Sequence, residues 1–178
     1  MASNSSNDSF HRLTIAAMAA SLENLGKILA KAEAHASFSK IEPEALLGAR
    51  LYPDMFSLVQ QLQYALYLPM DFARHFTDEP APHVGYEEAT FGDVHAGLKT
   101  AIAYLKAIPA GRLAERAQRV VPIFFDGTKG MPADVYAATV EMPDFYFHLS
   151  IAYAILRHNG VPLSKDDFIG PYKSTPIE

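Results

Sequence analysis

The sequence predicts an all-α fold, a four-helix bundle with a long crossover before its last helix. Apolar residues recur at spacings of three and four in four separate segments, which is typical of amphipathic helices packed on a common core. The crossover is predicted from β-branched and aromatic runs on either side of "DGTKGMP", where the helical period is lost. A chain of 178 residues is long enough for one sizeable core and short for two. We therefore expect one helical domain over residues 9–178, after a disordered Ser/Asn-rich leader over residues 1–8.

The first helix is expected at residues 9–35, with Ser9 or Asp8 as its N-cap. Its apolar stripe consists of Phe10, Leu13, Ala17, Met18, Leu22, Leu25, Ile28 and Leu29. This length is more typical of a bundle than of other globular domains.

The second long helix follows a short helical turn over residues 43–49. Pro53 fits its first helical position, and Asp54 fits the first turn, where the helix dipole favours a carboxylate. Pro69 marks the point where this helix ends or kinks, although "MDFARHF" can continue it for two turns.

The third and fourth helices flank the crossover. Thr90 begins the third helix, which residues 109–111 close, and the fourth runs from near Pro143 to Gly160. Between them, residues 119–125 and 134–140 are predicted to be short extended segments.

Composition and charge exclude several classes of function. The formal net charge is −5 and basic residues do not cluster, so no nucleic-acid partner is expected. The chain has no cysteine, which excludes disulfides, zinc–thiolate sites and thiol nucleophiles. The N-terminus does not resemble a signal peptide, and no apolar run reaches the ~20 residues of a membrane span. A soluble cytoplasmic protein with no membrane partner is expected.

Three sequence blocks carry a resemblance to a known family. They are "ARLYPDMFSLVQQLQYA" from residue 49, "YEEATFGDV" from residue 86 and "MPDFYFHLSIAYAILRHNGVPLSKDDFIG" from residue 142. The chain resembles the domain-of-unknown-function family numbered 1993, whose members look like relatives of the DinB/YfiT-type four-helix bundles. The resemblance extends over nearly the whole chain after residue 9 and implies a DinB-like bundle.

The wider DinB-like superfamily also implies a metal site. Many of its members bind a divalent metal through one histidine on the second helix and a His-x-x-x-His pair on the fourth, and several act with a low-molecular-weight thiol. On this chain the second histidine of the pair corresponds to His148 and the first to Asp144. The second helix has no matching histidine, and its nearest polar candidates are Asp54 and Gln61. The resemblance therefore implies a divalent metal as the candidate cofactor, with Asp144 and His148 as ligands.

His148 and Asp144 are the candidate catalytic residues, because a spacing of four places them on one helix face. His148 is interpreted as a buried core histidine with one hydrogen-bond partner, as a general acid/base, or as a metal ligand. Asp144 either compensates the positive N-terminus of its helix or fixes the tautomer of His148.

Four further residues are candidates for binding a substrate. Arg50 and Asp54 form an ordinary ion pair, or Arg50 binds a substrate carboxylate. Gln61 is one of three nearby glutamines, of which at least one is expected to face inward and to need a partner for its amide. Tyr146 is expected to be a core aromatic whose hydroxyl reaches a partner.

Two functions follow from these residues. The first is a small-molecule enzyme with a pocket at one end of the bundle, which performs a transfer, an isomerisation or a dehydration by acid/base or metal-assisted chemistry. The alternative is a non-catalytic binding or structural module that forms a homodimer through its long helices, with the polar inner residues fixing helix register.

Overall fold

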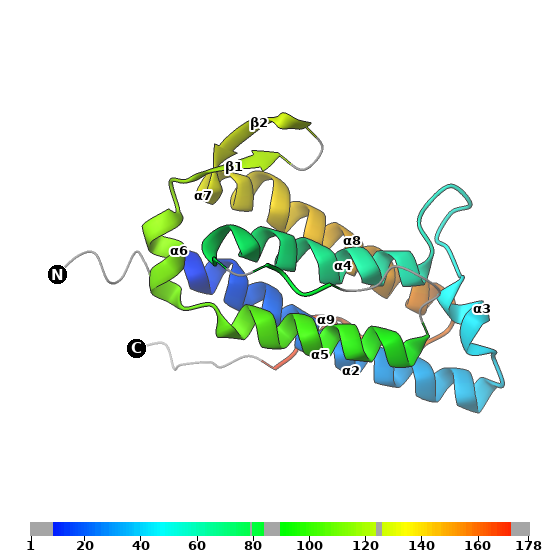
Figure 1. Ribbon diagram of the computed structural model, residues 1–178. Helices are drawn as coiled ribbons and strands as arrows, with labels where there is room; N and C mark the ends of the chain where they lie inside the picture. Colours follow the sequence, from blue (N-terminus) through cyan, green and yellow to red (C-terminus); the bar gives the residue numbers. More distant parts are fainter. Residues whose placement is uncertain (1–8, 79, 84–89, 124–125, 172–178) are drawn as a thin grey trace, which may run out of the picture.

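The computed structural model describes residues 9–78, 80–83, 90–123 and 126–171. The predicted leader over residues 1–8 lies outside the described residues. The long helices of the described part are α2 (Ile15–Ser39), α4 (Leu58–Ala73), α5 (Phe91–Ala107) and α8 (Met142–His158). They pack side by side: α4 contacts α8 and α5, and α2 contacts α5 (Figure 1). The prediction of a mostly helical fold is confirmed.

Helix α2 ends four residues beyond its predicted range of 9–35. Residues 9–13 form a preceding helical segment, and α2 itself ends at Ser39 because Lys40 adopts a left-handed backbone conformation with φ of 56°. The helical stretch Ser9–Ser39 is long and apolar enough to cross a membrane by length and composition alone. Half of its most apolar part is buried in the core, as in the central helix of a folded domain.

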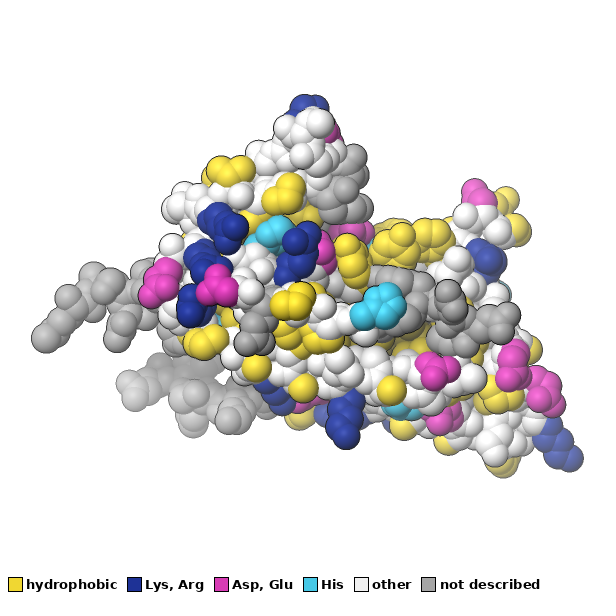
Figure 2. Space-filling view, in the orientation of Figure 1, with side chains coloured by type: hydrophobic (Ala, Val, Ile, Leu, Met, Phe, Trp, Pro, Cys, Tyr) yellow, Lys and Arg dark blue, Asp and Glu magenta, His cyan; other side chains and the backbone are white. Residues whose placement is uncertain are grey.

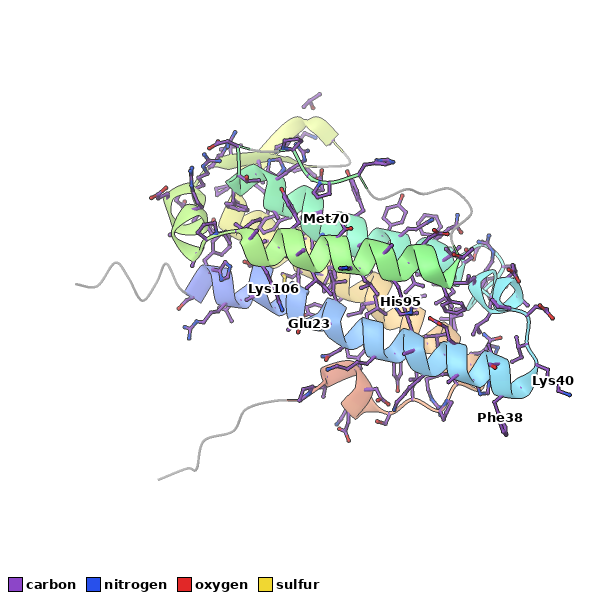
Figure 3. All side chains as sticks on the ribbon, turned by 60° about the horizontal axis from the view of Figure 1, so that its bottom comes forward. Glu23, Phe38, Lys40, Met70, His95 and Lys106 are labelled. Atoms are coloured by element: carbon purple, nitrogen blue, oxygen red, sulfur yellow. The ribbon has the colours of Figure 1, made fainter. Side chains whose placement is uncertain are left out.

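Helices α2 and α5 are joined by charged pairs on their outer surface as well as by the core. Lys106 of α5 pairs with Glu23 of α2, and His95 of α5 contacts Glu33 of α2. Figure 3 shows Lys106 and Glu23 close together on neighbouring helices. These pairs lie at the surface, so each contributes little to stability.

Helix α4 begins later than predicted. The short helix α3 (Pro43–Leu47) lies in the predicted turn, but Pro53 and Asp54 are in the loop before α4, so the prediction of a helix start at Pro53 is wrong. The reason is a stronger start signal downstream: the Ser57 N–H donates to Oε1 of Gln60 at 2.9 Å, which closes a capping box. Pro69 lies inside α4, which continues to Ala73 and into the short 3₁₀ helix η1 (Arg74–Phe76).

The segment between α5 and α8 contains a two-stranded antiparallel hairpin. After the short helix α6 (Ala110–Arg116), strand β1 (Val120–Ile123) lies within the predicted segment 119–125 and pairs with β2 (Asp126–Pro132). Gly130 is required in β2, because a Cβ at this residue would lie 2.7 Å from the carbonyl oxygen of Val121.

The second predicted extended segment, 134–140, is wrong. These residues are helical, in α7 (Ala133–Tyr136) and in the π-helix η2 (Ala137–Glu141), which leads directly into α8. Their β-branched composition favours a strand locally, but burial of Ala133, Tyr136 and Ala137 on one helical face overrides that preference. Beyond α8, the short helix α9 (Lys165–Ile169) packs against α2, where Asn24 Nδ2 donates to the Ile169 carbonyl at 2.9 Å.

Candidate functional site

Polar and aromatic side chains line the contact between α4 and α8. The two helices run in opposite directions, since Gln61 contacts His148 near one end and Asp71 acts on Glu141 near the other. Each helix presents its polar residues at spacings of three and four, so they share one face. We call this set the α4–α8 seam: Gln61, Tyr64, Tyr67 and Asp71, with Glu141, Asp144 and His148.

His148 is buried and held by a short hydrogen bond. Its Nδ1 lies 2.6 Å from Oε1 of Gln61, while Nε2 of the Gln61 amide points to the Phe56 carbonyl oxygen at 3.5 Å. A carbonyl only accepts, so the amide nitrogen belongs on that side and the amide oxygen faces the imidazole. Nδ1 of His148 therefore carries the proton and donates to Gln61. The neutral ring keeps a lone pair on Nε2.

The free nitrogen of His148 faces a carboxylate. Nε2 lies 3.4 Å from Oδ1 of Asp144, one helical turn earlier. Burial lowers the pKa of His148 below its ordinary value, and the negative charge of Asp144 opposes this effect. His148 is therefore neutral at neutral pH, with a basic nitrogen beside a group that stabilises the imidazolium once a proton is taken up.

Aromatic rings enclose the imidazole. Tyr64 stacks on His148 with ring centroids 4.9 Å apart and planes 17° from parallel. Phe56 is parallel to both rings, at 5.1 Å from Tyr64 and 6.2 Å from His148, and Phe147 meets the imidazole edge-on at 5.5 Å. These rings restrict the imidazole to one orientation and exclude water from it.

Glu141 is the deepest acidic group of the seam. It is 2% exposed, and its Oε1 is buried without a hydrogen-bond partner in the described part of the chain. Burial raises the pKa of Glu141 well above its ordinary value, and the charges of Asp71 and Asp144 raise it further. At neutral pH this carboxyl therefore holds a proton more readily than an exposed glutamate does.

Asp71 and Tyr67 complete the far end of the seam. Asp71 pairs with Arg74 at 2.6 Å. Burial raises the pKa of Tyr67, and the charge of Asp71 and a hydrogen bond to it add to this effect. The hydroxyl of Tyr67 thus stays protonated, and its hydrogen bond to Asp71 holds it at the edge of the seam.

The structure brings three of the six predicted site residues together, namely Gln61, Asp144 and His148. The other three have different surroundings. Arg50 is exposed and donates to the carbonyl of Met55 in its own loop, and Asp54 is exposed in the same loop. Tyr146 faces α2, where its hydroxyl lies 3.3 Å from Oγ of Ser21. No contact in the described residues supports the predicted substrate-binding roles of these three.

The residues of the seam do not complete a metal site. Across the described ranges, no three His, Asp or Glu side chains converge as a metal ion requires. Asp144 and His148 supply two ligands, but Gln61, at the predicted second-helix position, uses its amide oxygen to accept from His148. The donor set therefore does not fit a firmly bound divalent metal.

Five residues of the site were not predicted from the sequence: Phe56, Tyr64, Tyr67, Asp71 and Glu141. Tyr64, Tyr67 and Asp71 repeat the spacing of Glu141, Asp144 and His148, three and then four residues apart. Matching this repeat between two antiparallel helices is the signal that would have found four of the five. Phe56 lies in an irregular loop, and no periodic pattern indicates its position.

The seam opens on a partly apolar surface. In Figure 1 the β1–β2 hairpin and the loop before α4 project from the same side of the molecule. Figure 2 shows hydrophobic side chains on the surface between them. Exposed hydrophobic residues of the loop, of β1 and of helices α4, α7 and α8 are Leu51, Tyr52, Phe56, Tyr67, Val120, Val135 and Phe147.

Comparisons with known proteins agree on the family and the fold. The family model named Domain of unknown function (DUF1993) matches residues 10–169. A crystal structure of a DinB family member protein from Shewanella denitrificans is similar, with a TM-score of 0.87 and 30% sequence identity over 95% of this chain and 97% of that chain. No curated protein matches the chain.

Proposed function

The chain belongs to the domain-of-unknown-function family DUF1993, and from its α4–α8 seam we propose that it is a small-molecule enzyme that uses His148 as a general acid/base. The proposal takes α2, α4, α5 and α8 as a DinB-like four-helix bundle with the reaction centre between α4 and α8. It applies to a transfer, an isomerisation or a dehydration, each of which needs a proton moved at the substrate.

One observation supports this proposal above the others, the 2.6 Å hydrogen bond between Nδ1 of His148 and Oε1 of Gln61. It places the lone pair on Nε2, the nitrogen that lies beside Asp144. A neutral imidazole in this state takes a proton from a substrate, and Asp144 stabilises the charge that results. Because the seam does not complete a metal donor set, we assign no step to a metal.

The exposed loop before α4 is proposed to contribute to substrate binding. Arg50 and Asp54 are carried by this loop, which also carries Phe56, and Phe56 is parallel to the His148 ring. A substrate that extends from the seam over Phe56 reaches these two charged residues.

The test is conversion of small molecules by the purified protein. Wild type and His148→Gln are incubated with a mixture of cellular metabolites, and consumption of each compound is followed by mass spectrometry. General acid/base catalysis contributes about 10²–10⁴-fold to rate, so His148→Gln is expected to lose at least about 100-fold. His158→Gln, an exposed histidine in the last turn of the same helix, is the matched control and is expected to act as wild type.

Two results would contradict the proposal. One is equal conversion by wild type and His148→Gln, which would make His148 a structural residue. The other is the absence of any conversion by folded wild-type protein across the mixture.

A second candidate is supported by the exposed aromatic residues around the seam. We propose as the alternative a cytoplasmic homodimer without catalytic activity, in which Tyr52, Phe56 and Phe147 of two copies meet. Phe147 is 52% exposed, Tyr52 is 65% exposed and Phe56 is 39% exposed, and exposed apolar residues that form a patch mark interaction surfaces. Sedimentation of wild type and Phe147→Ser distinguishes the candidates: a dimer that Phe147→Ser converts to monomer supports the alternative, and a wild-type monomer contradicts it.

A further inference from the structure

We propose that the α4–α8 seam binds an organic cation, a protonated amine attached to an apolar group, through Glu141, Asp144 and the aromatic rings beside His148. This inference rests on the proposed function and names the substrate class of the same site. It depends on three observations: the buried Oε1 of Glu141 has no partner among the described residues, the charges around Glu141 are mainly negative, and aromatic rings surround His148.

One oxygen of the Glu141 carboxyl, Oε1, is buried and lacks a hydrogen-bond donor among the described residues. A buried polar atom left in this state destabilises a fold by about 1–3 kcal/mol, so such atoms are rare unless a ligand satisfies them. Glu141 is also the last residue of the π-helix η2, and π-helical turns occur frequently at functional sites.

The charges around Glu141 favour a cation. Asp71 and Asp144 both act on Glu141 electrostatically, and Asp71 has its own partner in Arg74 at 2.6 Å. Over the residues that the structure describes, no Lys or Arg lies within ion-pair distance of Asp144 or Glu141. His148 is neutral at neutral pH, because burial lowers its pKa. A ligand with one positive charge would therefore provide the counter-charge that the chain itself does not.

The aromatic rings favour an organic cation over an inorganic one. Phe147 and Tyr67 are exposed at the edge of the seam, and Tyr64 stacks on His148 just inside it. Ring faces attract an ammonium group and bury the apolar group attached to it. A metal ion needs several converging donors, and the described residues do not place three of them together.

The geometry allows an ammonium to reach the carboxylates from solvent. The side chains of Asp144 and Asp71 are 29% and 19% exposed, so solvent reaches them. Glu141 is 2% exposed and is the more deeply buried carboxyl. A primary ammonium has three N–H donors, so it can donate to the carboxylate of Asp144 and to Oε1 of Glu141, the two acidic groups that act on each other electrostatically.

The test compares two probes of similar size and shape, one with an ammonium group and the other with a neutral hydroxyl group. Binding of 2-phenylethylamine and of 2-phenylethanol to the full chain is measured by isothermal titration calorimetry at neutral pH, where the amine is protonated. We expect the dissociation constant of the amine to be lower by about tenfold or more. Equal affinity for the two probes, or binding of the alcohol alone, would overturn the inference.

Two variants test whether Glu141 and Asp144 cause the preference for the amine over the alcohol. Glu141→Gln and Asp144→Asn keep the size of the side chain, and each is expected to reduce the preference for the amine to about threefold or less. Glu115→Gln, on the exposed surface of α6, is the matched control and is expected to keep it. If both seam variants bind the amine as wild type does, the site lies elsewhere and the inference fails. Circular dichroism verifies that each variant is folded.

Proton release provides a readout specific to Glu141. Asp71, Asp144 and Tyr67 face this carboxyl, Arg74 lies beyond Asp71, and burial together with the two aspartates raises the pKa of Glu141. An ammonium beside Glu141 should displace its proton, so the apparent binding enthalpy should differ between two buffers of unlike ionisation enthalpy. The difference should vanish in Glu141→Gln. A difference that persists unchanged in this variant would overturn the role of Glu141.

The outcomes separate this inference from the proposed function. His148→Gln should still prefer the amine, because the carboxyls that bind it remain. If wild type prefers the amine but converts no small molecule, the cation site is supported and acid/base catalysis is refuted. If conversion depends on His148 but the amine and the alcohol bind equally, acid/base catalysis is supported and the cation site is refuted.

Discussion

Oε1 of Gln61 accepts a hydrogen bond from Nδ1 of His148 at 2.6 Å, and this contact joins α4 to α8 at one end of the seam. The two residues are 87 positions apart in the chain. The contact decides which nitrogen of His148 is basic, because the Gln61 amide is oriented in turn by the carbonyl of Phe56.

Replacing Gln61 by Leu should destabilise the protein and change the tautomer of His148. The buried Nδ1–H then has no acceptor, which costs about 1–3 kcal/mol in the free energy of unfolding. Urea unfolding measures this loss, and ¹⁵N NMR of the imidazole measures the tautomer. Gln118→Leu, at an exposed position, should change neither. A His148 that keeps the Nδ1–H form in Gln61→Leu would show that Gln61 does not determine the tautomer.

The stability contributed by neutral His148 should be lost in acid. The pKa of His148 is lower in the folded state than in the unfolded chain, mainly through burial, so the unfolded state binds the proton more readily. The contribution is fully present above the unfolded pKa of about 6.5 and falls as the pH drops through the folded pKa. Unfolding of wild type and His148→Gln at about pH 7.5 and about pH 5 measures it, and the variant should lose less stability on acidification. The same loss in both proteins would contradict this assignment.

Glu141 should have the opposite dependence on pH. Its pKa is raised in the folded state, chiefly by burial, so its contribution is present below the unfolded pKa and is lost as pH rises through the folded pKa. Glu141→Gln should therefore be more stable than wild type at about pH 8, by about 1–3 kcal/mol, and similar to it at about pH 4. Chemical unfolding at the two pH values tests this. A variant that is less stable at the higher pH would show that the ionised carboxylate has a partner.

Metal should be present well below one equivalent per chain. The seam offers Asp144 and His148 as metal ligands. The third oxygen that could bind the metal, Oε1 of Gln61, accepts a hydrogen bond from His148 instead. Elemental mass spectrometry of untagged protein purified without chelator measures the content of zinc, nickel, manganese and iron. A near-stoichiometric content that Asp144→Asn removes would contradict this expectation and restore the metal-site interpretation of the two residues.

The helices were largely predictable because their periodicity is local. The apolar residues of α2, α5 and α8 repeat at the helical period, so one face of each had to be buried whatever it packs against. The prediction from local sequence was wrong where a second signal, or burial in the core, favoured a different structure. Pro53 resembles a helix start, but the capping box of Ser57 and Gln60 begins α4 instead. Residues 134–140 resemble a strand, but burial of Tyr136 and its neighbours makes them helical.

The sequence by itself determined the helical fold, the family and the pairing of Asp144 with His148, because each depends on residues close together in the chain. Only the tertiary structure decided that Gln61 is the partner of His148 and that Arg50 and Tyr146 contact other groups. It also decided that Oε1 of Glu141 is buried without a hydrogen-bond partner among the residues that the structure describes. The physical reason is that a side chain's partner across a helix interface depends on the register between the two helices. That register is set by packing of the whole core, and no segment of the sequence contains it.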